Sequence, residues 1–209
     1  MQTKFLKPNN PLLKKIAEEI SPNQINSPDT RNAVKPMLKV AYGEQKDSSK
    51  PIMVGLAAPQ LGIPKRIILV DTKADGEGKV GDLKIYINPK IVWQSKRKGE
   101  WYEGCYSTGR VCGIVSRPIS IKIQALNLHS RSVNSNSLLE WKAKLVEEKW
   151  SGYIARIFQH EIDHLDGKLF YDHIKNPDHL HWVEDNEFPL YRNRKAWRNW
   201  PKKYPLPLA

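Results

Sequence analysis

The stretch FQHEIDHLDG, residues 158–167, decides how the rest of this sequence is interpreted. It contains two histidines four residues apart, with a glutamate directly after the first, which is the pattern H-E-x-x-H. Residues four apart share one face of a helix, so the imidazoles of His160 and His164 can bind one metal ion. Several unrelated enzyme classes share this pattern. The motif therefore predicts a metal site but does not indicate the enzyme class.

The residues around the motif predict an amphipathic helix from Gly152 to Leu165. At about 100° per residue, one arc of this helix is apolar, and it holds Tyr153, Ile154, Ile157, Phe158 and Leu165. Arg156, Gln159 and Asp163 point the other way. The motif residues His160, Glu161 and His164 lie inside the apolar arc. Burying two imidazoles and a carboxylate is unfavourable without compensation, and a metal ion is the usual compensation.

Length and composition are those of one ordinary cytoplasmic domain. The chain has 209 residues, of which 40% are hydrophobic and 27% charged, enough for a substantial core. No run approaches the roughly 20 apolar residues that span a bilayer, and the start of the chain lacks the apolar segment of a secretory signal. We therefore expect a cytoplasmic protein without membrane contact. Cys105 and Cys112 could pair, but thiols in a reducing compartment are more often buried, catalytic or metal-bound.

The middle of the chain predicts β-structure. Three segments rich in β-branched residues are typical of strands: 65–72, 83–93 and 119–127. Pro89 is expected to break the second strand. Residues 76–81, GEGKVG, match the nucleotide-binding pattern G-x-G-x-x-G, but a strand follows them instead of a helix, so we interpret them as a hairpin loop. A helix is expected near residues 30–43 and a solvated loop at 42–51.

The third metal ligand decides the class, because a catalytic zinc-like site takes three protein ligands and leaves one position for water. The metzincin continuation is excluded, since Phe170 stands where the third histidine would be. Glu184, 20 residues after His164, could act as in thermolysin-like proteases, although no clear helix presents it. Cys105 could complete a His₂Cys site as a thiolate. The residues alone leave Glu184 and Cys105 open.

Three stretches, in this order, resemble the peptide deformylase family: VGLAAPQLG at 54–62, EGCYS at 103–107 and YIARIFQHEIDHLDG at 153–167. The resemblance runs from about residue 5 to about residue 175. It implies an α+β fold in which antiparallel strands surround the central helix that carries HExxH. It also implies a metal ion bound by Cys105, His160 and His164. The implied reaction removes the N-formyl group from the formyl-methionine that begins nascent polypeptides.

The resemblance also implies how the reaction proceeds. A metal-bound hydroxide would attack the formyl carbon, with Glu161 as general base and then general acid. The Gln60 side-chain amide and the backbone N–H of Tyr106 would stabilise the developing oxyanion. In this family the ion is typically iron(II), and zinc, nickel or cobalt can substitute for it. We therefore expect one divalent metal ion and favour Fe²⁺.

Substrate binding is expected at the same place. Gly55, which lacks a Cβ, would let the substrate backbone approach closely. We infer that Tyr153 and Ile157 form a wall of the apolar pocket for the methionine side chain. Four positions depart from the usual family pattern, namely Met53, Tyr106, Thr108 and Gly109. These departures leave the peptide preference beyond formyl-methionine open.

A basic segment, RNRKAWRNWPKK at 192–203, supplies six lysines and arginines of a chain with net charge +12. Such a run is usually a solvated surface. It could instead neutralise phosphates of ribosomal RNA and stack Trp197 and Trp200 on bases. We therefore divide the chain into a catalytic domain, 1–175, and a C-terminal extension, 176–209.

Overall fold

The computed structural model describes residues 4–46, 52–130, 141–184 and 186–187. Within these ranges it contains two α-helices, α1 (Pro28–Lys46) and α2 (Gly152–Leu165). A five-stranded sheet has the order β1-β2-β3-β6-β7, with β1 Gly55–Ala57, β2 Ile67–Asp71, β3 Leu83–Gln94, β6 Ser120–Ser130 and β7 Trp141–Ser151. A three-stranded sheet has the order β4-β5-β8, with β4 Lys98–Gly104, β5 Val111–Pro118 and β8 Leu180–Trp182. All neighbouring strands pair antiparallel, so the predicted α+β class is confirmed.

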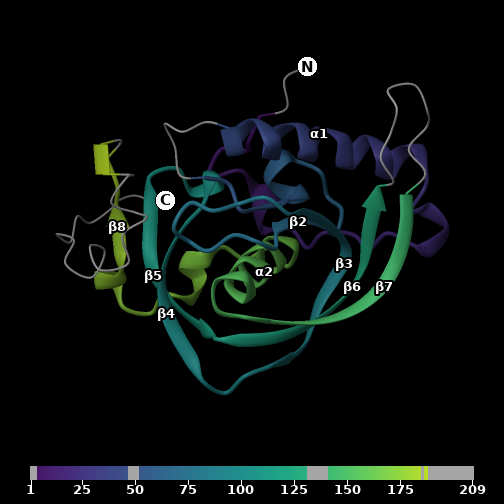
Figure 1. Cartoon of the computed structure of the whole chain (residues 1–209). Coiled ribbons are helices and arrows are strands. Elements are labelled where there is room, and N and C mark those ends of the chain that lie inside the picture. Colours follow the sequence, from purple (N-terminus) through teal and green to yellow (C-terminus); the bar gives the residue numbers. More distant parts are fainter. Residues whose placement is uncertain (1–3, 47–51, 131–140, 185, 188–209) are drawn as a thin grey trace.

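Helix α2 is enclosed by strands of both sheets and contacts β1, β2 and β7 of the five-stranded sheet and β5 of the three-stranded sheet (Figure 1). Its apolar arc packs into the core as predicted, with Phe158 and Leu165 fully buried. The opposite side is covered as well. Gln159 donates to the carbonyl oxygen of Pro118 at 3.0 Å, and Arg156 to that of Val115 at 3.0 Å. The helix is therefore buried nearly all round, and its polar side chains need partners inside the protein.

Strand β3 continues through Pro89, so the prediction that this proline breaks the strand is wrong. The ladder between β3 and β6 shifts register between Ile87 and Lys90, and Asn88 has a φ of +50°. The Asn88 side chain bonds both backbone groups of Ile20, at 2.9 and 2.7 Å. This bulge accommodates a residue that has no N–H to donate to the ladder.

The connection between β2 and β3 holds the GEGKVG segment, residues 76–81. Because β2 and β3 pair antiparallel on either side of it, the predicted hairpin loop is confirmed.

Helix α1 occurs where a helix was expected, but it continues to Lys46. The solvated loop predicted at 42–51 is therefore wrong for its first five residues, and residues 47–51 lie outside the described ranges.

The start of the predicted C-terminal extension packs against the rest of the protein. Leu180–Trp182 forms β8, which pairs with β5, and the adjacent Val183 is fully buried. The basic segment 192–203 lies outside the described residues. Neither of the two described helices is long and apolar enough to cross a membrane.

The N-terminal segment crosses the end of α2 at Gly167. The amide of Ala17 donates to the Leu165 carbonyl oxygen at 2.8 Å. Gly167 has a φ of +69°, and a Cβ there would lie 2.7 Å from the carbonyl carbon of Lys14. Only glycine satisfies both the backbone conformation and the close approach of the two chain segments.

We predict that Gly167→Ala lowers the free energy of unfolding by at least about 2 kcal/mol, because it combines left-handed strain with a backbone collision. Denaturant titration measures this loss. The matched control is Gly43→Ala in α1, where an added Cβ meets nothing within 4 Å, and stability should rise by about 0.5–1 kcal/mol. An unchanged denaturation midpoint for Gly167→Ala would show that glycine is not required where the N-terminal segment crosses the end of α2.

Candidate metal centre

The structure brings Cys105, His160 and His164 together. The two histidines lie one turn apart on α2, and Cys105 follows β4 at the start of a short 3₁₀-helix, Tyr106–Thr108. Their candidate ligand atoms all lie within 4.8 Å of one another. The Cys105 Sγ lies 3.2 Å from the Nε2 of His164. Among the described residues, this is the one cluster of three His, Cys, Asp or Glu side chains with metal-ligand spacing.

The Cys105 sulfur is suited to act as a thiolate. Burial raises the pKa of this thiol, but the neighbouring His164 and His160 outweigh burial and hold the pKa well below its usual value. The Nε2 of Gln60 donates to the sulfur at 3.2 Å and the Ser107 amide at 3.4 Å. Neither Cys105 nor Cys112 forms a disulfide bond, so the possible pairing between them is wrong. A thiolate is the form of cysteine that binds metals.

Glu161 lies beside the three ligands and is 4% exposed. Burial raises the pKa of its carboxyl to about 7, although the two histidines act in the opposite direction. Its Oε2 is buried and has no hydrogen-bond partner among the described residues. One sulfur and two imidazole nitrogens next to an unsatisfied carboxylate oxygen fit a catalytic divalent ion, which leaves a position for water.

Gly55 makes room for this carboxylate. A Cβ at Gly55 would lie 2.8 Å from the Cγ2 of Ile157 and would collide with the Oε1 of Glu161. The absence of a side chain at the start of β1 is therefore needed inside the protein. The close approach of a substrate backbone at Gly55 stays a prediction, independent of this packing.

Glu103 is a site residue that the sequence analysis missed. Its Oε2 lies 2.9 Å from the Nδ1 of His160, so the other nitrogen of this imidazole is available to a metal ion. Burial raises the pKa of Glu103, but the Arg117 guanidinium, at 2.7 and 2.9 Å, outweighs burial and holds the pKa well below its usual range. Its position two residues before Cys105 could have indicated it, whereas nothing near Arg117 in the sequence indicates this role.

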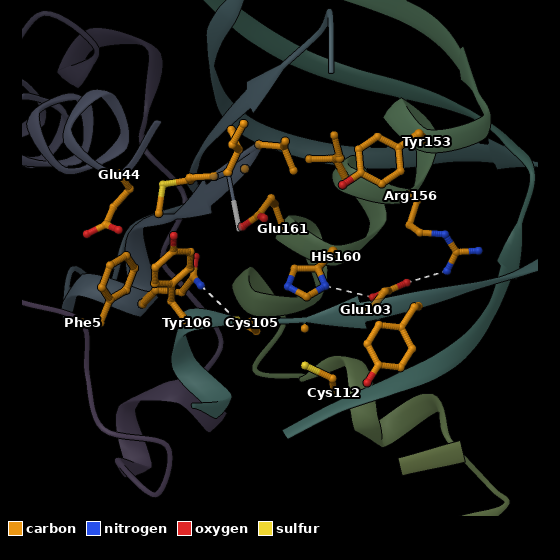
Figure 2. A pocket seen from close by; sticks show the side chains of 18 of the residues that line it. Phe5, Glu44, Glu103, Cys105, Tyr106, Cys112, Tyr153, Arg156, His160 and Glu161 are labelled. Carbon is orange, nitrogen blue, oxygen red and sulfur yellow. Dashed lines mark hydrogen bonds and ion pairs between the residues drawn. The ribbon is translucent and has the colours of Figure 1, made fainter. Parts of the chain in front are cut away.

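A cavity of about 650 Å³ opens beside the cluster (Figure 2). It is lined by eight of the nine predicted site residues: Gly55, Gln60, Cys105, Tyr106, Tyr153, Ile157, His160 and Glu161. The ninth, His164, is 1% exposed and lies behind the thiol. The Gln60 side chain is oriented by the Ala57 amide, which donates to its Oε1 at 2.7 Å. This bond leaves the Gln60 amide nitrogen directed at the cluster.

The cavity rim includes residues that the sequence analysis did not assign to the site. Phe5 stacks on Tyr106 with ring centroids 4.8 Å apart, and Glu44 also lines the cavity. Met53, one of the departures from the family pattern, is buried and contributes to the same wall. Tyr106 and Gly109 line the cavity as well, whereas the fourth departure, Thr108, does not.

The two positions that other HExxH enzymes use for a third ligand have different contacts in this fold. Phe170, at the metzincin position, stacks on the His160 ring with centroids 6.2 Å apart and planes 13° apart. Glu184 forms an ion pair with Arg110 and accepts from Trp182 Nε1 at 3.0 Å. Glu184 does not belong to the ligand cluster. The thermolysin-like arrangement is therefore not formed.

An HExxH helix with a cysteine as the third candidate ligand defines the class of this protein: a metal-site enzyme of the His₂Cys type. The sequence model described as "Polypeptide deformylase" matches residues 2–179. The peptide deformylase of Halalkalibacterium halodurans is 35% identical over 189 residues, which is 86% of this chain and 91% of that protein. This chain belongs to the polypeptide deformylase family, and it is an enzyme of the peptide deformylase type.

Two further comparisons extend this result. Peptide deformylase 1A, chloroplastic/mitochondrial, of Arabidopsis thaliana is 31% identical over 86% of this chain, which spans 64% of that protein's length. The crystal structure of the class I type b peptide deformylase of Acinetobacter baumannii with bound Met-Ala-Ser is similar in fold, with a TM-score of 0.67. It is 29% identical and the match covers 83% of this chain and 99% of that chain.

We predict that Cys105→Ala weakens divalent-metal binding by more than about 100-fold, because even outer-shell partners of metal ligands are worth about 10- to 100-fold. Metal content after gel filtration, normalised to protein, measures this loss. Cys112→Ala is the matched control, since this buried thiol is not part of the cluster, and it should retain the metal. Full metal content in Cys105→Ala would remove the thiol from the ligand set.

Proposed function

We propose that this enzyme removes the N-formyl group from the N-terminal formyl-methionine of nascent polypeptides. The observation that carries the proposal is the cavity of about 650 Å³ that is lined by Cys105 and His160 of the candidate metal site and by the buried Glu161. Membership of the family makes formylated peptides the substrates. The Met-Ala-Ser bound to the Acinetobacter baumannii relative supports methionine as the first residue.

Cys105, His160 and His164 would hold one divalent ion, and we favour Fe²⁺, with Zn²⁺, Ni²⁺ or Co²⁺ able to substitute. Such an ion would polarise the formyl carbonyl and lower the pKa of water at the site. Glu161 would take a proton from the attacking water and return it to the leaving amine. Its pKa of about 7 supports both tasks, because a group near the working pH accepts and donates protons readily.

Gln60 and Tyr106 are the proposed donors to the oxyanion that forms on the formyl oxygen. The Gln60 amide nitrogen is directed at the cluster because the Ala57 amide holds its oxygen. The backbone N–H of Tyr106 belongs to the residue directly after Cys105. Donors that are oriented before the reaction stabilise developing charge without reorganisation, which is why rigid placement supports this role.

The methionine side chain is proposed to bind against Tyr153 and Ile157, with the substrate backbone passing Gly55. Tyr153 packs at 5.6 Å from the Trp101 ring, which gives this end of the cavity an aromatic wall. Gly109, one of the departures from the usual family pattern, lines the cavity, so the peptide preference beyond the first residue is expected to differ from that of relatives with the usual pattern.

We further propose a catalytic domain at 1–175 and a C-terminal extension at 176–209 whose basic segment contacts ribosomal RNA. The high density of lysine and arginine with two tryptophans supports this contact. A cytoplasmic location without membrane contact is part of the same proposal, because the substrate emerges at the ribosome.

We predict that Glu161→Gln lowers kcat on a formyl-Met peptide by about 10²- to 10⁴-fold, the usual value of a general acid–base group, while the bound metal is retained. Glu184→Gln is the control, because its carboxylate is paired with Arg110 away from the cluster. It should leave turnover unchanged. Dependence on Glu184, together with cleavage of internal peptide bonds, would instead indicate a protease and overturn the proposed reaction.

We predict that deleting residues after 190 reduces co-sedimentation with ribosomes at low salt and leaves peptide deformylation unchanged. The binding of the full chain should fall steeply with salt, because released counterions drive such contacts. Equal sedimentation of the full and shortened chains at both salt concentrations would show that the basic segment is only a solvated surface.

A further inference from the structure

Arg156 is a buried cation in the cavity wall that the proposed reaction does not use. It lies on α2 one turn before His160 and is 8% exposed. Its Nη1 donates to the Oε1 of Glu103 at 2.6 Å. It also donates to two backbone carbonyl oxygens, those of Val115 at 3.0 Å and Gly99 at 2.7 Å. The guanidinium therefore joins α2 to both strands of the β4–β5 hairpin.

The contacts of Arg156 complete the hydrogen bonding of Glu103. The Oε1 accepts from Arg156 Nη1 at 2.6 Å and from Arg117 Nε at 2.7 Å. The Oε2 accepts from Arg117 Nη2 at 2.9 Å and faces His160 Nδ1 at 2.9 Å. An ionised carboxylate has about four acceptor positions, so every one is occupied. Rotation of Glu103 away from His160 would break several charge-assisted bonds at once.

The charges around Glu103 require a second cation. Arg117 is shared, because its Nη1 also donates to Asp163 at 2.7 Å. Without Arg156, the buried Glu103 and the partly buried Asp163 would share one guanidinium, with only His160 beside Glu103 and His173, whose Nε2 lies 2.8 Å from Asp163, as further partners. A buried charge with too few partners is costly. If packing alone were needed here, an apolar side chain would serve without desolvating a guanidinium.

This network runs from Arg156 through Glu103 to His160, one of the candidate metal ligands (Figure 2). A fixed Glu103 accepts the Nδ1 proton of His160 and so directs the other nitrogen to the ion. Arg156 also bonds Gly99 on β4 and Val115 on β5. Cys105 lies in the connection between these two strands. We propose that Arg156 is a positioning residue that sets the metal affinity of the site, an inference that rests on the proposed metal-dependent function.

The experiment measures metal affinity directly. Full-length enzyme loaded with Co²⁺ is mixed with graded concentrations of a chelator, and the visible absorption of the bound Co²⁺ reports both retention and ligand geometry. The variants are Arg156→Met, which removes the charge, and Arg156→Lys, which keeps it. Arg66→Met is the matched control: Arg66 is a partly buried arginine directly before β2 that binds the C-terminal end of α2, with Asp166 at 2.8 Å and the Leu165 carbonyl oxygen at 3.3 Å.

We expect Arg156→Met to weaken Co²⁺ binding by about 10-fold or more and to shift the absorption bands. Arg156→Lys should lie between Arg156→Met and wild type, because one ammonium replaces the charge but not the fork of bonds. Arg66→Met should lose stability yet keep wild-type affinity and spectrum. If Arg156→Met does not fold, Arg156→Lys decides, with a several-fold weakening expected.

Two results would overturn the inference: wild-type affinity and spectrum in the folded Arg156 variants, or an equal loss of affinity in Arg66→Met, which would trace the effect to stability alone. A wild-type enzyme that binds no Co²⁺ is a different failure. That result would remove the metal site itself, and with it the proposed function.

Discussion

The buried carboxylate of Glu103 is the interaction on which the arrangement of this protein depends. It lies on β4, next to the strand end that carries Cys105, and contacts His160 on α2. A charge in the interior persists only when hydrogen bonds and opposite charges replace the lost water. Arg117 from β5 supplies both. The hydrogen bonds of this one carboxylate thus join β4, β5 and α2, and the same part of the fold brings the candidate ligand atoms of Cys105, His160 and His164 within 4.8 Å of one another.

Burial makes the charge of Glu103 energetically costly, and it also raises the pKa of Glu161. Helix α2 is covered by strands on several sides, so the carboxyl of Glu161 has little water around it and its pKa rises to about 7. The space for it exists because Gly55 has no side chain. Burial raises the pKa of both acids, but the net shifts are opposite: the partners of Glu103 outweigh burial and keep it ionised, whereas Glu161 has few partners and its pKa stays raised.

The elements with strong periodicity were predicted well, and the others were not. The helix at 152–165 and the strands near 65–72 and 83–93 follow from their apolar patterns. Strand β7 was missed because charged residues on both of its faces interrupt the apolar alternation, and β8 because it is only three residues long. The break at Pro89 was predicted from the low strand preference of proline alone. The bulge at Asn88 allows β3 to continue through it.

The sequence by itself determined the chemistry of the site. The HExxH spacing on one helix determined which two imidazoles can share an ion, whereas Cys105 and Gln60 were indicated only by the resemblance of EGCYS and VGLAAPQLG to the family. Only the tertiary structure decided how these groups are held. Arg117 and Arg156 are 39 residues apart in the chain and meet at Glu103 through strand pairing and helix burial, which are long-range contacts that no local pattern encodes.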